Sequence, residues 1–202
     1  MTATLLLVLH GQTTSNTTGF YMGWSEEDLN EVGYLQAQRL SSRLASLPID
    51  SIYSSPLRRT YSTATILAEP RHLGVNVLND LIEIKLGGWE GLHKDEIKRR
   101  YPELWQQSRI DPSGITMPGG ESFPQVTERA VRALEMIAAA NEGKQAVIVT
   151  HEVVIKVLIA YALGVTNSIY RRIAVDNASL STIRVNSDNT RVITMNDVSH
   201  LG

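Results

Sequence analysis

The sequence predicts an α/β fold built on a mostly parallel β-sheet. Two apolar stretches, residues 5–9 and 145–150, each end in a histidine, His10 and His151. Continuous apolar runs of this length are typical of strands that are buried on both faces of a parallel sheet. Residues 5–54 also read as strand, helix and strand, an order that joins parallel neighbours.

Composition limits the classes of function. A chain of 202 residues suits one domain, and we expect a single domain over residues 1–202. The net charge of -2 argues against a nucleic-acid partner or an acidic membrane surface. The absence of cysteine excludes disulfides, thiolate catalysis and cysteine zinc sites. No apolar run approaches the ~20 residues that span a bilayer, and no signal-peptide pattern opens the chain, so we expect a cytoplasmic protein.

The segment after the first strand is predicted to be a loop. Residues 14–29 are polar, contain glycine and include Phe20 and Trp24. We expect these two aromatic side chains to cover the core. A helix with a leucine stripe is predicted over residues 29–47, ended by Pro48, and a strand over residues 49–54.

Two arginines follow the second strand at the start of a predicted helix. Pro56 suits a first helical turn, which places Arg58 and Arg59 near the helix N-terminus. The helix dipole favours anions at this position and opposes arginine unless an anion binds there. The alternative is a solvated pair of arginines, and we favour phosphate binding over it.

The rest of the chain supplies the remaining elements. Two acids, Glu83 and Glu90, lie in a glycine-rich aromatic segment, where a carboxyl group could donate a proton to a ligand or simply be solvated. The other predicted elements are an edge strand at 74–78, a surface helix at 94–100, an irregular stretch at 102–110, a turn at 117–122, long helices at 122–140 and 153–163, and an antiparallel pair at 179–185 and 191–196 around residues 187–189.

The two histidines are expected to converge. Ligands of open α/β sheets bind beyond the carboxyl ends of the strands. Two buried strands that both end in histidine would bring both rings to this edge. Together with the arginines, they make a ligand site a better interpretation than two surface histidines.

Six short motifs share an order and spacing that is specific as a set. They are residues 9–13 (LHGQT) with Asn16, 55–60 (SPLRRT), Glu83 before 87–91 (GGWEG), 119–122 (GGES), 149–151 (VTH) and 196–201 (NDVSHL). The set resembles the histidine phosphatase, or phosphoglycerate mutase-like, superfamily. The resemblance implies a three-layer α/β fold: a mostly parallel sheet with an antiparallel edge strand and helices on both faces.

The resemblance also implies catalytic roles. His10 corresponds to the nucleophile that takes the phosphoryl group, and Arg59 to a phosphate clamp. His151 corresponds to a second histidine that hydrogen-bonds the phosphate. Glu83 corresponds to the general acid and base, for which a raised pKa is expected because it must start protonated.

Binding residues and partners follow from the same resemblance. Gly11 and Asn16 are expected to contact the substrate together with Arg59 and His151, and Arg58 is expected at the surface. No cofactor and no metal are implied, although His10, Glu83 and His151 could also be read as metal ligands. The expected ligand is a small phosphorylated metabolite or inorganic phosphate, with no nucleic-acid or membrane partner, and the chain can be expected to form a homodimer.

Three positions depart from the pattern of the superfamily. Leu9 stands where arginine normally precedes the histidine, so one of two phosphate-binding guanidinium groups is missing. Gln12 replaces a more usual glutamate. Glu152 follows His151 where a small residue is common and adds a negative charge near the site.

Three functions are therefore compared. The first is a metal-independent phosphomonoesterase that acts through a phosphohistidine and is weakened by Leu9. The second is a pseudophosphatase that binds an anion or a partner without turnover. A phosphoglycerate mutase is the least favoured, because the chain is short for the mutases, whose insertions close over the site.

Overall fold

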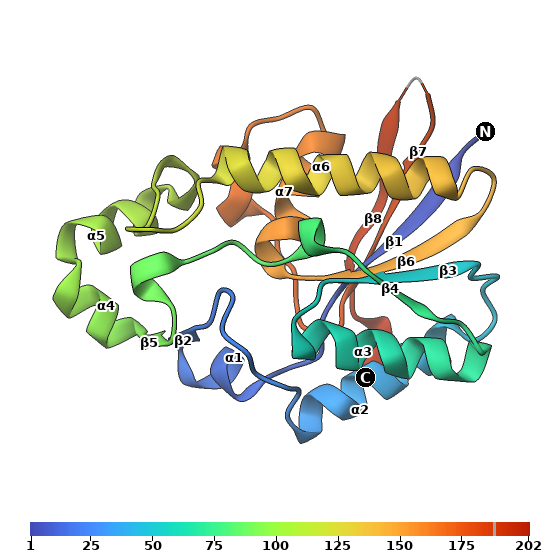
Figure 1. The fold of residues 1–202 in the computed structure, drawn as a ribbon, viewed down its shortest axis with the longest axis horizontal. Coiled ribbons are helices and arrows are strands. Elements are labelled where there is room, and N and C mark those ends of the chain that lie inside the picture. The colour runs from blue at the N-terminus through green and yellow to red at the C-terminus, as the bar shows by residue number, and fades with distance from the viewer. Residues whose placement is uncertain (188) are drawn as a thin grey trace.

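A computed structural model describes residues 1–187 and 189–202, and its centre is a mixed sheet of six strands (Figure 1). The strands are β1 (Ala3–Leu9), β3 (Ser51–Ser54), β4 (Val75–Val77), β6 (Gln145–Thr150), β7 (Leu180–Val185) and β8 (Thr190–Asp197). Their order is β4-β3-β6-β1-β7-β8. The first four strands pair in parallel, and β7 runs antiparallel to β1 and β8. The predicted mostly parallel sheet is confirmed, with its antiparallel strand one position in from the edge. Asp188 of the predicted turn lies outside the described residues.

Helices cover both faces of the sheet. They are α2 (Glu31–Leu44) and α3 (Arg58–Ala68) on one face, and α6 (Phe123–Ala140) and α7 (Glu152–Ala162) on the other (Figure 1). The side chains of β1 point alternately towards these two pairs of helices. Leu5, Leu7 and Leu9 pack with α6 and α7, whereas Leu6 and Val8 pack with α2 and α3. This two-sided burial explains why the strand reads as one continuous apolar run.

A smaller layer lies beyond the carboxyl ends of the parallel strands, at the left of Figure 1. It contains α1 (Thr14–Thr18), β2 (Phe20–Tyr21), β5 (Leu92–His93), α4 (Lys94–Arg100) and α5 (Pro102–Ile110). Short 3-10 helices cover Glu69–Arg71, Asn79–Leu81, Gly87–Trp89, Pro112–Gly114, Asn167–Arg172 and Ser199–Leu201. In residues 1–187 and 189–202, no helix combines the length and apolar character needed to cross a membrane.

Three expectations for this layer are wrong. Residues 102–110 form α5 and are not irregular, because proline begins the helix and Trp105 packs against Trp89 and Tyr21, with ring centres 6.2 Å apart in both pairs. Phe20 and Trp24 do not cover the core, since they are 45% and 39% exposed. Trp89 is part of the core instead, and Tyr21 packs against it. The expected loop over residues 14–29 also contains α1 and β2.

Candidate active site

His10 lies at the carboxyl end of β1 and is only 5% exposed. Its Nδ1 is 2.7 Å from the carbonyl oxygen of Gly11. Because a carbonyl only accepts hydrogen bonds, Nδ1 carries the proton and Nε2 keeps its lone pair. Burial, and then the charge of Arg59, lower the pKa of His10 to about 3. The imidazole is therefore neutral at physiological pH, with Nε2 available as a nucleophile.

Gly11 has a packing role that its motif did not reveal. A Cβ at this position would lie 2.4 Å from the backbone oxygen of Gly33, near the start of α2. The N–H of Gly11 donates to Thr63 Oγ1 at 3.1 Å. Gly11 does not line the cavity that contains the His10 side chain. The absence of a side chain at position 11 allows α2 and the end of β1 to approach closely.

His151 is brought beside His10, as the two strand ends predict. Strands β1 and β6 pair in parallel with Leu9 opposite Thr150, and the two ring centres lie 5.4 Å apart, edge to face. His151 is fully buried, and burial lowers its pKa well below the usual value. Its Nε2 lies 2.8 Å from Ser55 Oγ, while Nδ1 is buried without a partner among the described residues. Ser55 belongs to the motif of residues 55–60, but sequence reasoning assigned it no role.

Arg59 is the second residue of α3, and its side chain is buried, whereas Arg58 is exposed as expected. Its guanidinium donates to the carbonyls of Ser25 at 3.0 Å and Gly23 at 2.7 Å. These bonds fix the plane of the group and use two of its five N–H donors. The other N–H groups of Arg59 have no hydrogen-bond partner in the described part of the chain.

Glu83 faces the same cavity from the segment after β4. Its Oε1 accepts the N–H of Ile84 at 2.8 Å, and its Oε2 lies 3.5 Å from the N–H of Val153. Burial is the main cause that raises its pKa to about 7, and the charge of Glu152 adds to the shift. Near neutral pH a large fraction of Glu83 is protonated, as a proton donor requires.

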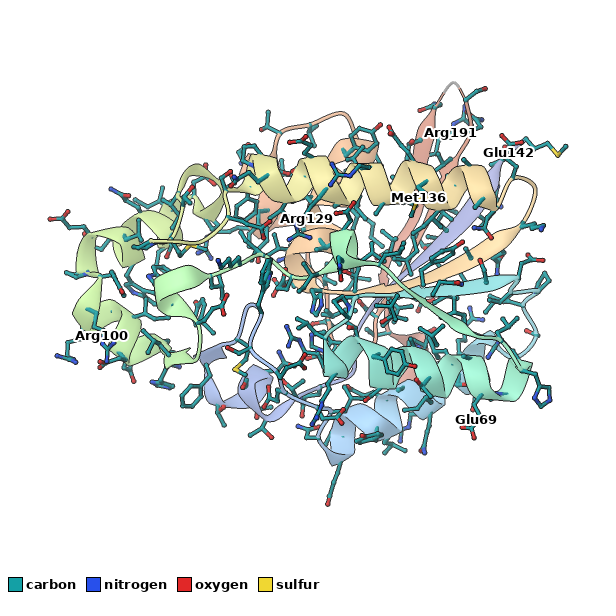
Figure 2. All side chains as sticks on the ribbon, in the orientation of Figure 1. Glu69, Arg100, Arg129, Met136, Glu142 and Arg191 are labelled. Carbon is teal, nitrogen blue, oxygen red and sulfur yellow. The ribbon has the colours of Figure 1, made fainter. Side chains whose placement is uncertain are left out.

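Arg129 holds the Glu83 segment in place from α6 (Figure 2). Its guanidinium donates to the carbonyls of Glu83 at 2.9 Å and Asp80 at 3.0 Å, and it pairs with Glu121 at 2.9 Å. Sequence reasoning missed this residue. The available signal was an arginine near the apolar stripe of a long helix, which requires a partner when buried.

Asn16 is oriented so that its amide N–H groups make no hydrogen bond with the residues that the structure describes. Its Oδ1 accepts from the N–H of Thr13 at 2.9 Å and from Asn177 Nδ2 at 3.1 Å. His10, Asn16, Arg59 and Glu83 all line one cavity of about 620 Å³. His151 lies behind its wall. Among the described residues, no three histidine, aspartate or glutamate side chains form a group able to hold a metal ion.

Comparison with known proteins identifies the family. A family model described as the histidine phosphatase superfamily (branch 1) matches residues 5–198. The chain belongs to this superfamily. It is 35% identical over 198 residues to phosphoserine phosphatase 1 of Hydrogenobacter thermophilus, covering 98% of this chain and 94% of that protein. It is 34% identical over 208 residues to a metal-independent phosphoserine phosphatase of Arabidopsis thaliana, covering 98% and 82%.

The fold of this histidine phosphatase also matches a solved structure. The YhfR protein of Bacillus stearothermophilus superposes with a TM-score of 0.95 at 32% identity, and the match covers 99% of this chain and 100% of that one. The expected three-layer fold is confirmed. Named relatives are phosphatases that act on phosphate esters.

Two of the three positions that were expected to depart from the superfamily pattern lie in the wall of the cavity. Leu9 is buried in the core beside α6 and α7, and it also lines the cavity. Glu152 lines the cavity as well, so the expected negative charge is present.

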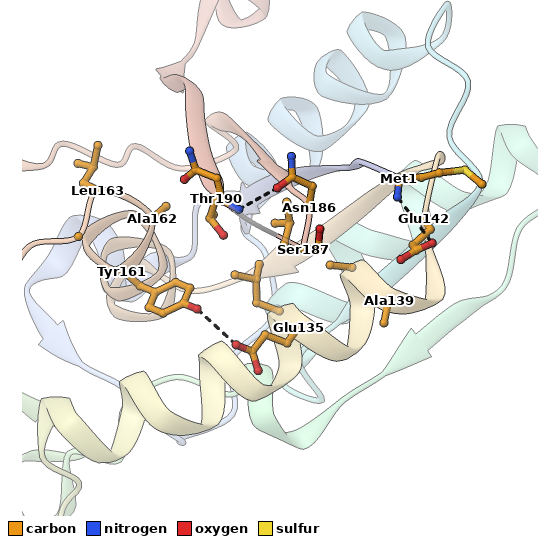
Figure 3. A pocket seen from close by; sticks show the side chains of 15 residues that line it. Met1, Glu135, Ala139, Glu142, Tyr161, Ala162, Leu163, Asn186, Ser187 and Thr190 are labelled. Carbon is orange, nitrogen blue, oxygen red and sulfur yellow. Dashed lines mark hydrogen bonds and ion pairs between the residues drawn. The ribbon is translucent and has the colours of Figure 1, made fainter.

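A second, larger cavity of about 730 Å³ lies away from both histidines. Figure 3 shows it between α6, the end of α7 and the β7–β8 strands, with Tyr161 bonded to Glu135. Its described lining residues include no histidine, lysine or arginine, so it lacks the groups that phosphate chemistry requires.

Proposed function

We propose that the chain is a phosphomonoesterase that hydrolyses a small phosphorylated metabolite through a phosphohistidine on His10. The observation that carries this proposal is the pairing of a neutral His10, whose Nε2 is free, with Glu83, whose pKa is raised to about 7, in one cavity. Relatives named phosphoserine phosphatase support the same class of reaction.

In the first step, Nε2 of His10 attacks phosphorus and forms a P–N bond while the ester P–O bond breaks. Protonated Glu83 gives its proton to the departing alkoxide, so a neutral alcohol leaves. Negative charge on the phosphoryl oxygens is stabilised by the free N–H donors of Arg59 and by the amide of Asn16. His151, edge to face with His10, completes the polar end of the site.

In the second step, a water molecule attacks the phosphohistidine. Glu83, now a carboxylate, takes a proton from this water as the new P–O bond forms and the P–N bond breaks. Inorganic phosphate leaves, His10 regains its lone pair, and Glu83 is protonated for the next cycle. Apart from the ester and one water molecule, the two steps as written use only side chains of this protein.

Leu9 is proposed to slow this reaction. A removed donor to developing negative charge costs roughly 3–4 kcal/mol, or about 10²–10³ in rate. Leucine also places apolar surface next to a dianion and offers no hydrogen bond in return. We expect weak turnover because the N–H donors of Arg59 and Asn16, which both line the cavity, remain.

A panel of phosphate esters, scored for free phosphate and for isomer exchange, tests the proposal. Release of free phosphate supports the phosphatase, phosphate binding without turnover favours the pseudophosphatase, and isomer exchange favours the mutase. Brief incubation with a labelled ester should leave an acid-labile, base-stable phosphate on the protein. His10→Ala should remove it, whereas His200→Ala, near the C-terminus, should keep it. Label that persists in His10→Ala would place the nucleophile elsewhere.

A further inference from the structure

Trp24 is an exposed aromatic residue that is bonded to the segment of the proton donor. Its side chain is 39% exposed, and it does not line the cavity that contains His10. Its indole Nε1–H donates to the backbone carbonyl of Glu83 at 2.6 Å. Since Trp24 belongs neither to the buried core nor to the cavity wall, this hydrogen bond is the contact that can give it a role.

The residues on either side of Trp24 bind the phosphate clamp. The carbonyl of Gly23 accepts from the Arg59 guanidinium at 2.7 Å, and the carbonyl of Ser25 accepts from it at 3.0 Å. Residues 23–25 therefore form a bridge segment that contacts Arg59 through two backbone carbonyls and Glu83 through one side chain. The proton donor and the clamp are joined by three consecutive residues.

The backbone of Glu83 is held from two sides. Its carbonyl oxygen accepts from Trp24 Nε1 and also from Arg129 on α6, at 2.9 Å. These two bonds use both lone pairs of the oxygen. Lys85 makes a second contact with the bridge segment, because its Nζ lies 5.5 Å from the centre of the Trp24 ring. Trp24 thus fixes the segment after β4 on the side opposite to the bond from α6.

The position of this backbone decides where the carboxyl group lies. Glu83 Oε1 accepts the N–H of Ile84 at 2.8 Å, and Oε2 lies 3.5 Å from the N–H of Val153. Both partners are backbone groups, so the carboxyl group moves when its own segment moves. A proton donor must lie within about 2.6–3.2 Å of the ester oxygen. A displaced Glu83 therefore slows proton transfer, whereas the phosphate keeps its contacts with other side chains.

We propose that Trp24 is a positioning residue that holds Glu83 in a fixed place relative to Arg59, so that the proton donor and the phosphate clamp act on the same ester. This inference rests on the proposed phosphatase function and adds to its site a residue that touches neither the substrate nor the phosphate. Trp24 acts through its indole N–H and not through the size of its ring.

Two substitutions separate the hydrogen bond from the ring. Trp24→Phe keeps an aromatic ring and loses the N–H, whereas Trp24→His keeps an N–H near the same place and loses the larger ring. Loss of one hydrogen bond predicts a kcat about fivefold lower for 2-hydroxyethyl phosphate in Trp24→Phe. Trp24→His should stay near the unaltered protein. Hydrolysis of p-nitrophenyl phosphate should change little in either variant, because its leaving group needs little protonation.

Amide hydrogen exchange tests the positioning without any turnover. The N–H of Ile84, which donates to Glu83 Oε1, should exchange about fivefold faster in Trp24→Phe and at the unaltered rate in Trp24→His. The N–H of Gly11, which donates to Thr63 Oγ1, is the reference and should not change. NMR measures both amides in one sample, and the Gly11 amide also shows that the variant is folded.

Tyr61→Phe is the matched control. Tyr61 is also an exposed aromatic residue, 46% exposed on α3, and its side chain makes no hydrogen bond in the part of the chain that the structure describes. This control should match the unaltered protein in both experiments. Equal losses of kcat on the two esters in Trp24→Phe, a loss of the same size in Trp24→His, or unchanged exchange of Ile84 would each overturn the inference.

The two measurements also separate this inference from the proposed function. Faster exchange of Ile84 in Trp24→Phe alone, without turnover of any ester by the unaltered protein, would remove the phosphatase and keep the contact of Trp24 with Glu83. Turnover by the unaltered protein, together with unchanged exchange and kcat in Trp24→Phe, would leave the phosphatase standing and remove the role of Trp24.

Discussion

Replacing Glu83 by glutamine should remove the proton donor and, at alkaline pH, stabilise the fold. Burial raises the pKa of Glu83 from 4.5 to about 7. The folded protein thus holds a proton that the unfolded chain has already released. The stability from this proton is fully present below about pH 4.5 and is lost as the pH rises through about 7. Glutamine does not titrate and avoids the loss.

The size of this change in stability follows from the shift in the pKa of Glu83. At about 1.36 kcal/mol per pKa unit, a rise from 4.5 to about 7 sets an upper limit of about 3 kcal/mol. Because Glu83 is only partly buried, water screens the charge, and we expect on the order of 1–2 kcal/mol. Urea unfolding at pH 4.5 and pH 9 measures the free energy of unfolding of both proteins and so gives this difference. A difference between Glu83→Gln and the unaltered protein that is the same at both pH values would refute the reasoning.

The same variant should lose activity in a way that depends on the leaving group. Hydrolysis of alkyl esters should fall on the order of 10²-fold or more, since their alkoxide must be protonated. The rate of p-nitrophenyl phosphate hydrolysis should fall less, because that leaving group needs little protonation. In the unaltered protein, alkyl ester turnover should be constant below about pH 7 and fall above it, because the pKa of His10, about 3, lies far below this range. Equal losses on both esters would contradict the assigned role.

Three further substitutions test the site and its support. Leu9→Arg should raise kcat/KM by at least about tenfold on a good ester, and no gain in a folded protein would favour the pseudophosphatase. Arg129→Lys, which weakens the support of Glu83, should lower the free energy of unfolding by up to roughly 3 kcal/mol. It should also lower kcat. An unchanged kcat would mean that Arg129 stabilises the fold but does not position Glu83. Gly33→Ala should destabilise by at least about 1–3 kcal/mol, because its Cβ would lie 2.1 Å from a backbone oxygen. Gly74→Ala, whose Cβ meets nothing within 4 Å, is its control in thermal unfolding.

The strands and the meeting of the two histidines could be predicted from sequence. Strands buried on both faces consist of uninterrupted apolar residues, and this pattern predicts β1 and β6. Parallel pairing then requires their carboxyl ends to lie at one edge, and His10 and His151 meet there. The prediction needed only local pattern and one rule of topology.

The remaining features depend on contacts between distant segments. α5 is stabilised by packing of Trp105 on Tyr21 and Trp89, which no local pattern indicates. The bond from Arg129 to Glu83 and that from Ser55 to His151 join residues 46 and 96 positions apart. The partner of a buried polar residue is set by the folded structure, so the sequence alone does not predict these positioning contacts.

Leu9 and Glu152 both line the cavity, but their effects on an anion differ. Leu9 offers no hydrogen bond to a phosphate oxygen. The carboxylate of Glu152 is paired with Lys156 at 2.6 Å, and both side chains of this pair line the cavity, so their charges largely offset each other. We therefore expect Leu9→Arg to raise the affinity for a phosphate ester more than Glu152→Gln does, and an equal gain from both substitutions would argue against this difference.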